Sequence, residues 1–421
     1  MNRTPEQIRQ SLFALTTRGI KYDLERISAA AVALGNPQNS CPSYHVAGTN
    51  GKGSTCSYIE SILRKAGYRT GLFTSPHLVR FEERFRINGE MVETSEWVEV
   101  YHDLERHIAD NRLTFFEATM LMAAECFRRR NIDWAVYETG LGGRLDATNI
   151  LRPRVSIITR VAMDHHEYLG NTLPEVFREK LGIVKETVPL VIADPGEPDL
   201  RSMAQTVCMQ RKAHCTFISA NDAYEIRETS GGTSFIHHGT SFTTRMTGGY
   251  QVENALLAIS AIARAKTSVS RETMQAGIAD AFIPGRFERI TAGKKTVVLD
   301  VAHNPAAAAE LCRTLRRFFP DSSLCFVVGI MADKEYPAML RSYTAVAQHI
   351  ILTRPATERA ATPEALAADL PSTLYSIVDR VGEAVKCAFR REEAVLCITG
   401  SFYTVGEAML SAGWDVISGN D

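Results

Sequence analysis

Short apolar runs and amphipathic helical patterns alternate along the first half of this chain. The run 44–47 is apolar and strand-like, and the residues behind it carry apolar side chains at a helical period: Ile59, Ile62, Leu63 and Ala66. The alternation continues to about residue 212. Further strands are expected at 70–74, 133–138 and 155–159, and helices at 94–109 and 115–130. This pattern predicts a parallel sheet covered by helices on both faces.

Polar residues mark where these segments begin and turn. Thr94 or Ser95 is expected to cap the helix that runs to about residue 109, and Thr114 precedes the next helix. Asn88-Gly89 is a turn signal. Residues 5–34 are predicted to be helical, with a break at 16–19.

The pattern changes twice in the second half. Residues 215–247 are rich in Thr, Ser and Gly, which predicts a small antiparallel excursion, and helices are expected at 252–266 and 271–281. Pro284-Gly285-Arg286 then interrupts the pattern. Strands are expected at 296–301, 324–330, 348–353 and 394–399, with helices between them. We therefore divide the chain into domains at 1–290 and 291–421, the second a Rossmann-like α/β domain.

Composition narrows the class of protein. The chain has 421 residues, 45% of them hydrophobic and 23% charged, and a formal net charge of −1. These values fit a soluble globular protein of more than one domain, with no overall field that favours nucleic acid or a membrane. The N-terminus lacks the apolar core of a signal peptide, and the nine cysteines form no C-x-x-C pair. We expect a cytoplasmic monomer that acts on small molecules.

The junction after the first strand carries the main candidate for chemistry. Gly48-Thr49-Asn50-Gly51-Lys52-Gly53-Ser54 lies between the strand and a helix, where backbone N–H groups and the helix dipole favour an anion. Lys52 supplies a charge for the β/γ-phosphates, and Ser54 or Thr55 can face magnesium. A glycine-rich turn with a surface lysine is the alternative. The order of strand, loop and helix favours a P-loop-type ATPase domain.

Two later strands also end in polar side chains. Glu138 closes the run 133–138, and His165 follows the run 155–159. In open α/β sheets, ligands bind beyond the carboxyl ends of the strands, so both side chains are expected near Lys52. There a carboxylate would hold a hard metal ion that bridges phosphates. The alternatives are a solvated acid and a structural histidine.

Three further positions are candidates for a chemical role. Lys180 lies in a partly apolar helix, where a lysine is usually a surface residue with a buried stem, and a carbamylated lysine is the rarer possibility. The segment Asp300–Pro305 places an acid, His303 and an amide on one loop after the first strand of the second domain. Ser401 follows the last strand in the same way. Turn chemistry alone would account for both loops.

Taken in order, these motifs resemble the Mur ligase superfamily, and within it the folate branch of dihydrofolate synthases and folylpolyglutamate synthases. The motifs that carry the resemblance are Gly48–Ser54, Thr74–Leu78, Phe116-Glu117, Glu138–Asn149, Asp164-His165, Glu179-Lys180, Pro284–Phe287, Asp300–Pro305, Asp333-Lys334 and Gly400-Ser401. The resemblance implies a two-domain ligase with ATP between the domains. Such enzymes phosphorylate a carboxylate, and the amine of an amino acid then attacks the acyl phosphate.

The resemblance also implies a role for individual residues. The residues that it implies for ATP binding are Gly48, Thr49, Asn50, Gly51, Lys52, Gly53, Ser54, Asn254, Arg286 and Asp300. For two magnesium ions they are Ser75, Glu138 and His165, with Lys180 as the carbamylated lysine. For glutamate they are His303 and Ser401. Lys52, Lys180 and His303 are thereby the catalytic candidates.

The choice of acid substrate rests on a second set of residues. Tyr22, Thr114, Phe116, Asp146 and Ala147 match pterin or folate positions of the family. Asp146-Ala147 favours bifunctional enzymes that also use dihydropteroate, because an acid can bind the donor-rich edge of a pterin. The segment 19–26 differs from some bifunctional members at Lys21 and Tyr22. A folylpolyglutamate synthase without the first activity, another Mur-type ligase, an ATPase switch and a non-catalytic folate binder are the alternatives.

Overall fold

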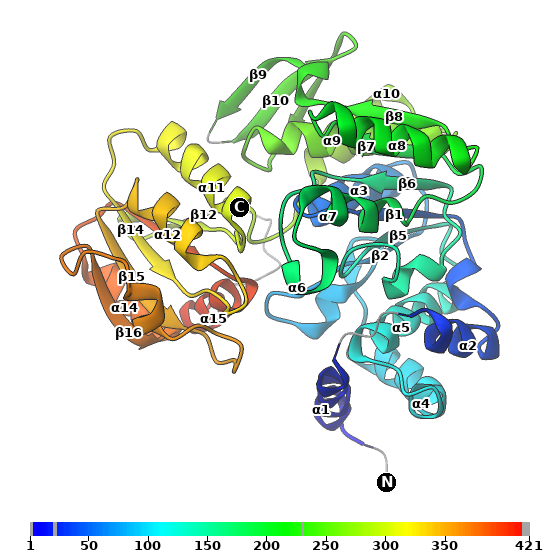
Figure 1. The fold of residues 1–421 in the computed structure, drawn as a ribbon, viewed down its shortest axis with the longest axis horizontal. Helices are drawn as coiled ribbons and strands as arrows, with labels where there is room; N and C mark the ends of the chain where they lie inside the picture. The colour runs from blue at the N-terminus through cyan, green and yellow to red at the C-terminus, as the bar shows by residue number, and fades with distance from the viewer. Residues whose placement is uncertain (1–2, 20–22, 230, 415–421) are drawn as a thin grey trace.

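The computed structural model describes residues 3–19, 23–229 and 231–414. Figure 1 shows two lobes side by side, with the chain passing from one to the other near residue 285. The larger lobe holds roughly the first two thirds of the chain, in blue to green. The smaller lobe, in yellow to red, holds the C-terminal part.

An eight-stranded sheet forms the centre of the larger lobe, in the order β4-β3-β2-β5-β1-β6-β7-β8. Its strands are β1 (Ser43–Ala47), β2 (Thr70–Phe73), β3 (Phe85–Ile87), β4 (Glu90–Met91), β5 (Trp134–Glu138), β6 (Val155–Ile158), β7 (Leu190–Ala193) and β8 (Cys215–Ile218). The six strands from β2 to β8 in this order are parallel, and β3 and β4 pair antiparallel at one edge. Asn88 and Gly89 form the tight turn between β3 and β4, both with positive φ, as expected for a primed hairpin turn.

Helices cover both faces of this sheet, as the alternating pattern predicts. One face packs on α3 (Lys52–Lys65), α9 (Tyr250–Arg264) and α10 (Arg271–Asp280). The other packs on α1 (Pro5–Ala14), α2 (Glu25–Ala33), α4 (Thr94–Asp110) and α5 (Phe115–Arg129). Near β6 and β7 lie α6 (His166–Leu169), α7 (Leu173–Leu181) and α8 (Pro198–Gln210).

Two details of the larger lobe differ from expectation. The helix α4 begins at Thr94 and its N-cap is Glu93, so neither Thr94 nor Ser95 is the cap; the Thr94 hydroxyl instead donates to Glu82. Strand β8 joins the parallel sheet, so the antiparallel excursion is shorter than 215–247. It consists of β9 (Tyr224–Thr229), β10 (Gly232–His237) and β11 (Thr240–Thr244). By contrast, Thr114 caps α5 as expected, in a reciprocal capping box with Glu117.

The smaller lobe holds a six-stranded sheet in the order β12-β13-β17-β14-β15-β16. Its strands are β12 (Glu288–Ala292), β13 (Lys295–Leu299), β14 (Leu324–Val328), β15 (His349–Arg354), β16 (Tyr375–Arg380) and β17 (Val395–Thr399). Its helices are α11 (Pro305–Phe318), α12 (Tyr336–Thr344), α13 (Pro363–Ala367), α14 (Val381–Arg390) and α15 (Phe402–Ala412). Strands β12 and β16 lie at the edges and were not expected from the sequence.

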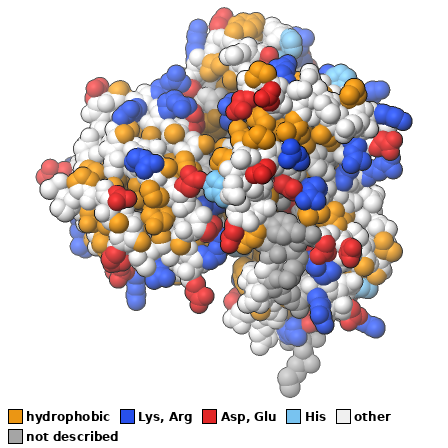
Figure 2. Space-filling model, in the orientation of Figure 1, with side chains coloured by type: hydrophobic (Ala, Val, Ile, Leu, Met, Phe, Trp, Pro, Cys, Tyr) orange, Lys and Arg blue, Asp and Glu red, His pale blue; other side chains and the backbone are white. Residues whose placement is uncertain are grey.

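The hairpin of β12 with β13 bears on the domain division. Strand β12 pairs with β13 over residues 288–292, so a division between 290 and 291 falls inside a strand. The division therefore stays a prediction, and the pairing favours placing it before Glu288. In the described part of the chain, no helix has both the length and the apolar character needed to cross a membrane. Figure 2 shows acidic and basic side chains intermingled over the visible face, which agrees with the near-zero net charge.

Candidate active site between the two lobes

The phosphate loop lies at the C-terminal end of β1, in the middle of the parallel sheet. It joins Ala47 to Lys52, the first residue of α3. Gly48 and Gly51 have positive φ values of 150° and 91°. The segment that follows β6 holds the loop in place, because the backbone N–H groups of Thr49 and Asn50 donate to the Arg160 carbonyl at 3.0 and 3.2 Å. Lys52 folds back over the loop, and its ammonium donates to the carbonyls of Gly48 and Thr49 at 3.3 Å each.

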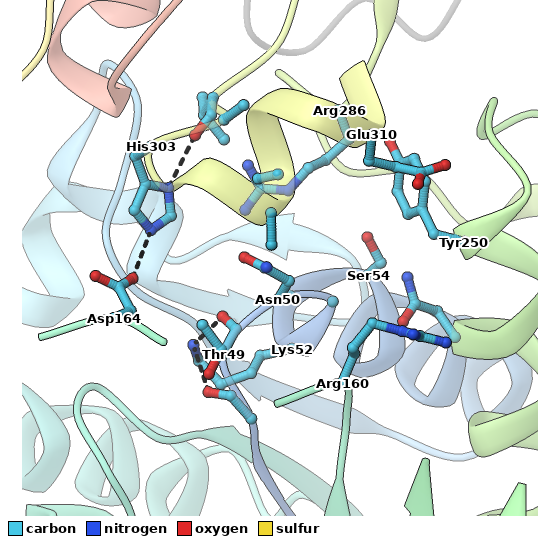
Figure 3. A pocket seen from close by; sticks show the side chains of 18 of the residues that line it. Thr49, Asn50, Lys52, Ser54, Arg160, Asp164, Tyr250, Arg286, His303 and Glu310 are labelled. Atoms are coloured by element: carbon cyan, nitrogen blue, oxygen red, sulfur yellow. Dashed lines mark hydrogen bonds and ion pairs between the residues drawn. The ribbon is translucent and has the colours of Figure 1, made fainter. Parts of the chain in front are cut away.

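This loop forms one wall of a cavity of about 830 Å³ where the two lobes meet. Figure 3 shows Asn50, Lys52 and Ser54 on the loop side, with Arg286 of the C-terminal part extending toward them. In the same view His303 faces Asp164, and Glu310 lies beside Tyr250. All ten residues expected to contact ATP line the cavity: Gly48, Thr49, Asn50, Gly51, Lys52, Gly53, Ser54, Asn254, Arg286 and Asp300. A volume of this size fits a nucleotide together with part of a second substrate.

Strand register brings the expected metal-side residues to the same place. Val46 of β1 is level with Glu138 of β5, so the Glu138 carboxylate lies beside the start of α3. Its Oε2 accepts the Ser75 backbone N–H at 3.0 Å, and burial raises its pKa although Lys52 opposes that shift. Ser75, Glu138 and His165 all line the cavity.

The donor chemistry of this wall fits a hard divalent cation. Among the residues described, no three His, Cys, Asp or Glu side chains converge as a metal cage. Magnesium usually keeps several waters and takes one or two carboxylates together with substrate phosphates, so the single carboxylate of Glu138 beside a phosphate loop suits it. Burial keeps the imidazole of His165 neutral by lowering its pKa to about 4.

Lys180 is the most perturbed lysine of the cavity. Its side chain is buried on α7, and its ammonium donates to the Gly48 carbonyl at 2.9 Å. Burial, and after it the charge of Lys52, lowers its pKa to about 7. A substantial fraction of Lys180 is therefore an uncharged amine at neutral pH, which is the form that reacts with carbon dioxide.

The C-terminal lobe contributes an acid, a guanidinium and an imidazole. Asp300 accepts backbone N–H groups of Phe287 and Ala302, both at 2.8 Å, and burial raises its pKa to about 6 against the opposing charge of Arg286. His303 Nδ1 bonds to the Val301 carbonyl at 2.9 Å, which leaves Nε2 to face Asp164 Oδ2 at 3.6 Å. Burial lowers the pKa of His303 to about 4, so its imidazole is neutral.

The expected pterin residues that the structure describes, Thr114, Phe116, Asp146 and Ala147, do not line this cavity. The Asp146 carboxylate accepts backbone N–H groups of Gly140, Leu141 and Thr148 at 2.8 to 3.0 Å, and so it orders the loop after β5. The ring of Phe116 packs on Gly140, and Ala147 is buried. Tyr22 lies outside the described residues. These contacts leave the pterin role of Thr114, Phe116, Asp146 and Ala147 a prediction.

Ser401 also lies outside the lining of the cavity. Its hydroxyl caps α15 by accepting the Thr404 backbone N–H at 3.1 Å, and it bonds to the Thr404 hydroxyl at 2.8 Å. Its neighbour Phe402 lines the cavity in its place. The glutamate role of Ser401 therefore stays a prediction. His303, the other residue expected to bind glutamate, does line the cavity.

The structure adds polar residues to which the sequence assigned no role. Asp164 faces His303 and His165, and Lys334 reaches it from the C-terminal lobe. Both belong to motifs noticed in the sequence, Asp164-His165 and Asp333-Lys334, but their proximity depends on how the lobes meet. Glu310 of α11 also lines the cavity. It lies in a helix whose repeated alanines give no signal of a site.

Residues 46–262 match the Mur ligase middle domain, and residues 285–402 match the Mur ligase glutamate ligase domain. The chain is 33% identical to the dihydrofolate synthase/folylpolyglutamate synthase of Escherichia coli over 396 residues, 94% of this chain and 92% of the relative. This chain belongs to the Mur ligase family, in its folate branch.

Solved structures of this Mur ligase branch have the same fold. The structure of E. coli FolC in complex with DHPP and ADP matches with a TM-score of 0.88 and 31% identity, covering 98% of each chain. A bifunctional folylpolyglutamate synthase/dihydrofolate synthase from Yersinia pestis, complexed with AMPPNP and a Mn ion, matches with a TM-score of 0.86 and 29% identity, again over 98% of each chain. The expected α/β architecture with two sheet-containing lobes is confirmed.

Proposed function

We propose that this Mur ligase joins L-glutamate to dihydropteroate, which gives dihydrofolate, and adds further glutamates to reduced folates. ATP supplies the energy and leaves as ADP and phosphate. The observation that carries the proposal is the cavity between the lobes, where a phosphate loop faces His303, Asp300 and Arg286 of the lobe that matches the glutamate ligase domain. The E. coli relative, named for both activities, supports the same assignment.

The first chemical step depends on positive groups that offset the negative charge of the phosphates more than on proton transfer. A carboxylate is a poor electrophile because oxide is a poor leaving group, and transfer of a phosphoryl group to it splits one difficult step into two. The backbone N–H groups from Gly51 to Ser54 and the ammonium of Lys52 would hold the β/γ-phosphates, and Arg286 adds positive charge from the opposite lobe. Asn254 and Asp300 would contact the rest of the nucleotide. In this way the chain positions the reactants and balances their charge.

Magnesium supplies neutralisation of the phosphate oxygens when bound. Ser75, Glu138 and His165 would hold it, since a hydroxyl, a buried carboxylate and a neutral imidazole line the cavity beside the phosphate loop. We propose two such ions. Lys180, with its lowered pKa and its place beside Gly48, would be carbamylated, and the added anion would face the same cations.

The second step needs an uncharged amine on glutamate. His303 is neutral, and because Nδ1 is bonded to the Val301 carbonyl, Nε2 keeps its lone pair on the side of the cavity. We propose that His303 binds the incoming glutamate and orients its amine toward the acyl phosphate. Ser401 would act with it from the start of α15. The tetrahedral intermediate then expels phosphate and leaves the amide.

The balance between the two acid substrates is the finer part of the proposal. A folylpolyglutamate synthase without dihydropteroate activity would use the same phosphate loop and the same glutamate lobe. By their resemblance to bifunctional members of the family, Asp146-Ala147 favour an enzyme with both activities. We further propose that the chain works in the cytoplasm as a monomer on small molecules, without nucleic acid or membrane.

Product analysis tests the proposal. Purified protein is incubated with ATP, magnesium, L-glutamate and dihydropteroate, and the products are identified by mass spectrometry. We expect dihydrofolate and ADP, and neither product from a Lys52→Ala variant that keeps its fold by circular dichroism. Formation of ADP without any amide product would contradict the ligase assignment.

A further inference from the structure

A loop of the C-terminal lobe contacts the larger lobe beside the cavity. Lys334, between β14 and α12, places its ammonium 2.7 Å from Asp164 Oδ1, and each of the two side chains is only 7% exposed. This buried ion pair joins the two lobes directly.

The same contact reaches His165, one of the residues that we assign to the metal. Asp164 Oδ1 also accepts the His165 backbone N–H at 2.9 Å, and His165 has a positive φ of 53°. Lys334 Nζ lies 3.4 Å from His165 Nε2. A non-glycine residue in the left-handed region persists only where its surroundings hold it there. Asp164 and Lys334 are those surroundings, and Lys334 comes from the opposite lobe.

A second bridge joins the C-terminal lobe to the phosphate loop. Asn304 Nδ2 donates to Asn50 Oδ1 at 2.9 Å, and Asn50 Nδ2 donates to Asn304 Oδ1 at 3.3 Å. Asn304 is buried, and it also caps α11 by accepting the Ala307 backbone N–H at 2.9 Å. Its Nδ2 lies 3.4 Å from Asp164 Oδ2, so the two bridges share one network.

We propose that Lys334 and Asn304 are positioning residues, which place His165 and the phosphate loop correctly only when the C-terminal lobe is docked. The proposal rests on the proposed ligase function. The phosphate loop belongs to one lobe and His303 to the other, so the acyl phosphate is safe from water only after docking. A link from the C-terminal lobe to both Asn50 and His165 makes formation of the acyl phosphate depend on the presence of the amine-binding lobe.

The chain offers a variant for each bridge and a matched control. Lys334→Met removes the charge, and Lys334→Arg restores it. Asn304→Ser keeps an oxygen that can cap α11 but loses the amide pair with Asn50. Glu335→Gln is the control, because Glu335 is adjacent to Lys334 and also crosses between the lobes, pairing with His166, but its side chain is 50% exposed and touches neither His165 nor the phosphate loop.

Steady-state kinetics with dihydropteroate, ATP and L-glutamate give the first readout. We expect Lys334→Met to lower kcat on the order of 100-fold, as misplacement of reacting groups does, with little change in the KM for ATP. We also expect phosphate release to exceed amide formation, because a poorly sealed acyl phosphate hydrolyses. Lys334→Arg should recover part of kcat. Asn304→Ser should shift the same ratio, whereas Glu335→Gln should leave kcat and the ratio unchanged.

A second readout does not depend on activity. Binding of Mn²⁺ in the presence of ADP, followed by electron paramagnetic resonance, should weaken in Lys334→Met and Asp164→Asn but not in Glu335→Gln. The double variant should weaken binding no more than one single variant, because both remove the same contact. Additive losses of Mn²⁺ affinity in the double variant would overturn the proposal. So would a Lys334→Met variant whose kcat and phosphate-to-amide ratio equal those of Glu335→Gln.

Two controls keep the test decisive. If Lys334→Met fails to fold by circular dichroism, Asn304→Ser decides the question, and an unchanged phosphate-to-amide ratio in that variant would refute the proposal. If the wild-type protein forms no amide, the proposed function has failed. In that case the Mn²⁺ affinities of the same variants test the positioning role of Lys334 by themselves.

Discussion

At the residue scale, the phosphate loop depends on glycines that differ in what an added side chain would meet. Gly51 has a φ of 91°, and a Cβ on it would lie 2.3 Å from Asn254 Oδ1. Gly53, two residues later, lies in α3, and a Cβ there would come closest to the flexible end of Ile283, at 2.8 Å, with the Glu138 carboxylate at ordinary contact distance. The two glycines of one motif therefore have different physical reasons to be glycine.

This difference predicts unequal effects of alanine. Gly51→Ala is expected to lower the free energy of unfolding by roughly 1–3 kcal/mol, the usual cost of a strained backbone residue, and to abolish ADP binding. Gly53→Ala is expected to cost less, because Ile283 can move. Denaturant unfolding and calorimetric ADP titration measure both. Equal effects of the two substitutions would contradict the account of the loop.

Lys180 gives a prediction about pH. Its pKa of about 7 in the folded protein lies below the ordinary lysine value of 10.5. Between these values the unfolded chain binds more protons than the folded one, so Lys180 destabilises the fold increasingly as pH falls toward 7. In buffer depleted of carbon dioxide, Lys180→Met should melt at a higher temperature than wild type at pH 7, and the difference should narrow toward pH 10. A difference independent of pH would show that Lys180 is charged in the fold.

At the element scale, side chains that cap and pin loops decide the shape of the site. Asp146 accepts three backbone N–H groups in the segment after β5, and Phe116 packs on Gly140 of the same segment. The sequence predicted Asp146 as a ligand contact, but its oxygens already have partners in the backbone. Its first role is to hold the loop that continues from Glu138.

Asp146→Ala therefore tests a structural role beside the proposed pterin role. Removal of a buried acceptor for several donors should lower the free energy of unfolding by about 2–3 kcal/mol. Because the same loop lines the cavity, the KM for ATP should rise together with that for dihydropteroate. Urea unfolding and steady-state kinetics measure the two effects. A rise confined to dihydropteroate, with unchanged stability, would assign Asp146 to the pterin alone.

The contrast between correct and missed elements has a local cause. The strands that end at Ala47, Glu138 and Ile158 are short, apolar and buried, and their pattern predicts them well. The cap of α5 was also predictable, since Thr114 and Glu117 form a capping box within four residues. Strand β16 is half exposed and carries no such pattern. Strand β12 lies beside a proposed domain boundary and is fixed by its pairing with β13.

At the scale of the whole molecule, the site belongs to neither lobe alone. Residues of the phosphate loop, Glu138 and His165 could be grouped from the sequence because parallel strands end at one edge. The approach of Lys334 to Asp164 spans 170 positions and two lobes, and nothing local in the sequence indicates it. The same holds for Asn50 and Asn304. How the lobes meet is a tertiary result, and it decides which polar residues share the cavity.

His303 tests the division of labour between the lobes. His303→Ala is expected to raise the KM for L-glutamate by about tenfold or more, as loss of a buried polar contact does, with the affinity for ADP within about twofold of wild type. Initial rates against glutamate concentration and calorimetric ADP binding give the two values. An unchanged dependence on glutamate would remove His303 from the proposed glutamate site.

The central claim is that this cavity ligates glutamate to two acid substrates. The most direct test is phosphate release by the purified protein with ATP, magnesium and L-glutamate, with dihydropteroate in one reaction and a reduced monoglutamyl folate in another. The account predicts release with both acids, in each case only when glutamate is present. Release with the folate alone would show that the enzyme only adds glutamates to folates. No phosphate release with either acid, from folded protein, would contradict the account.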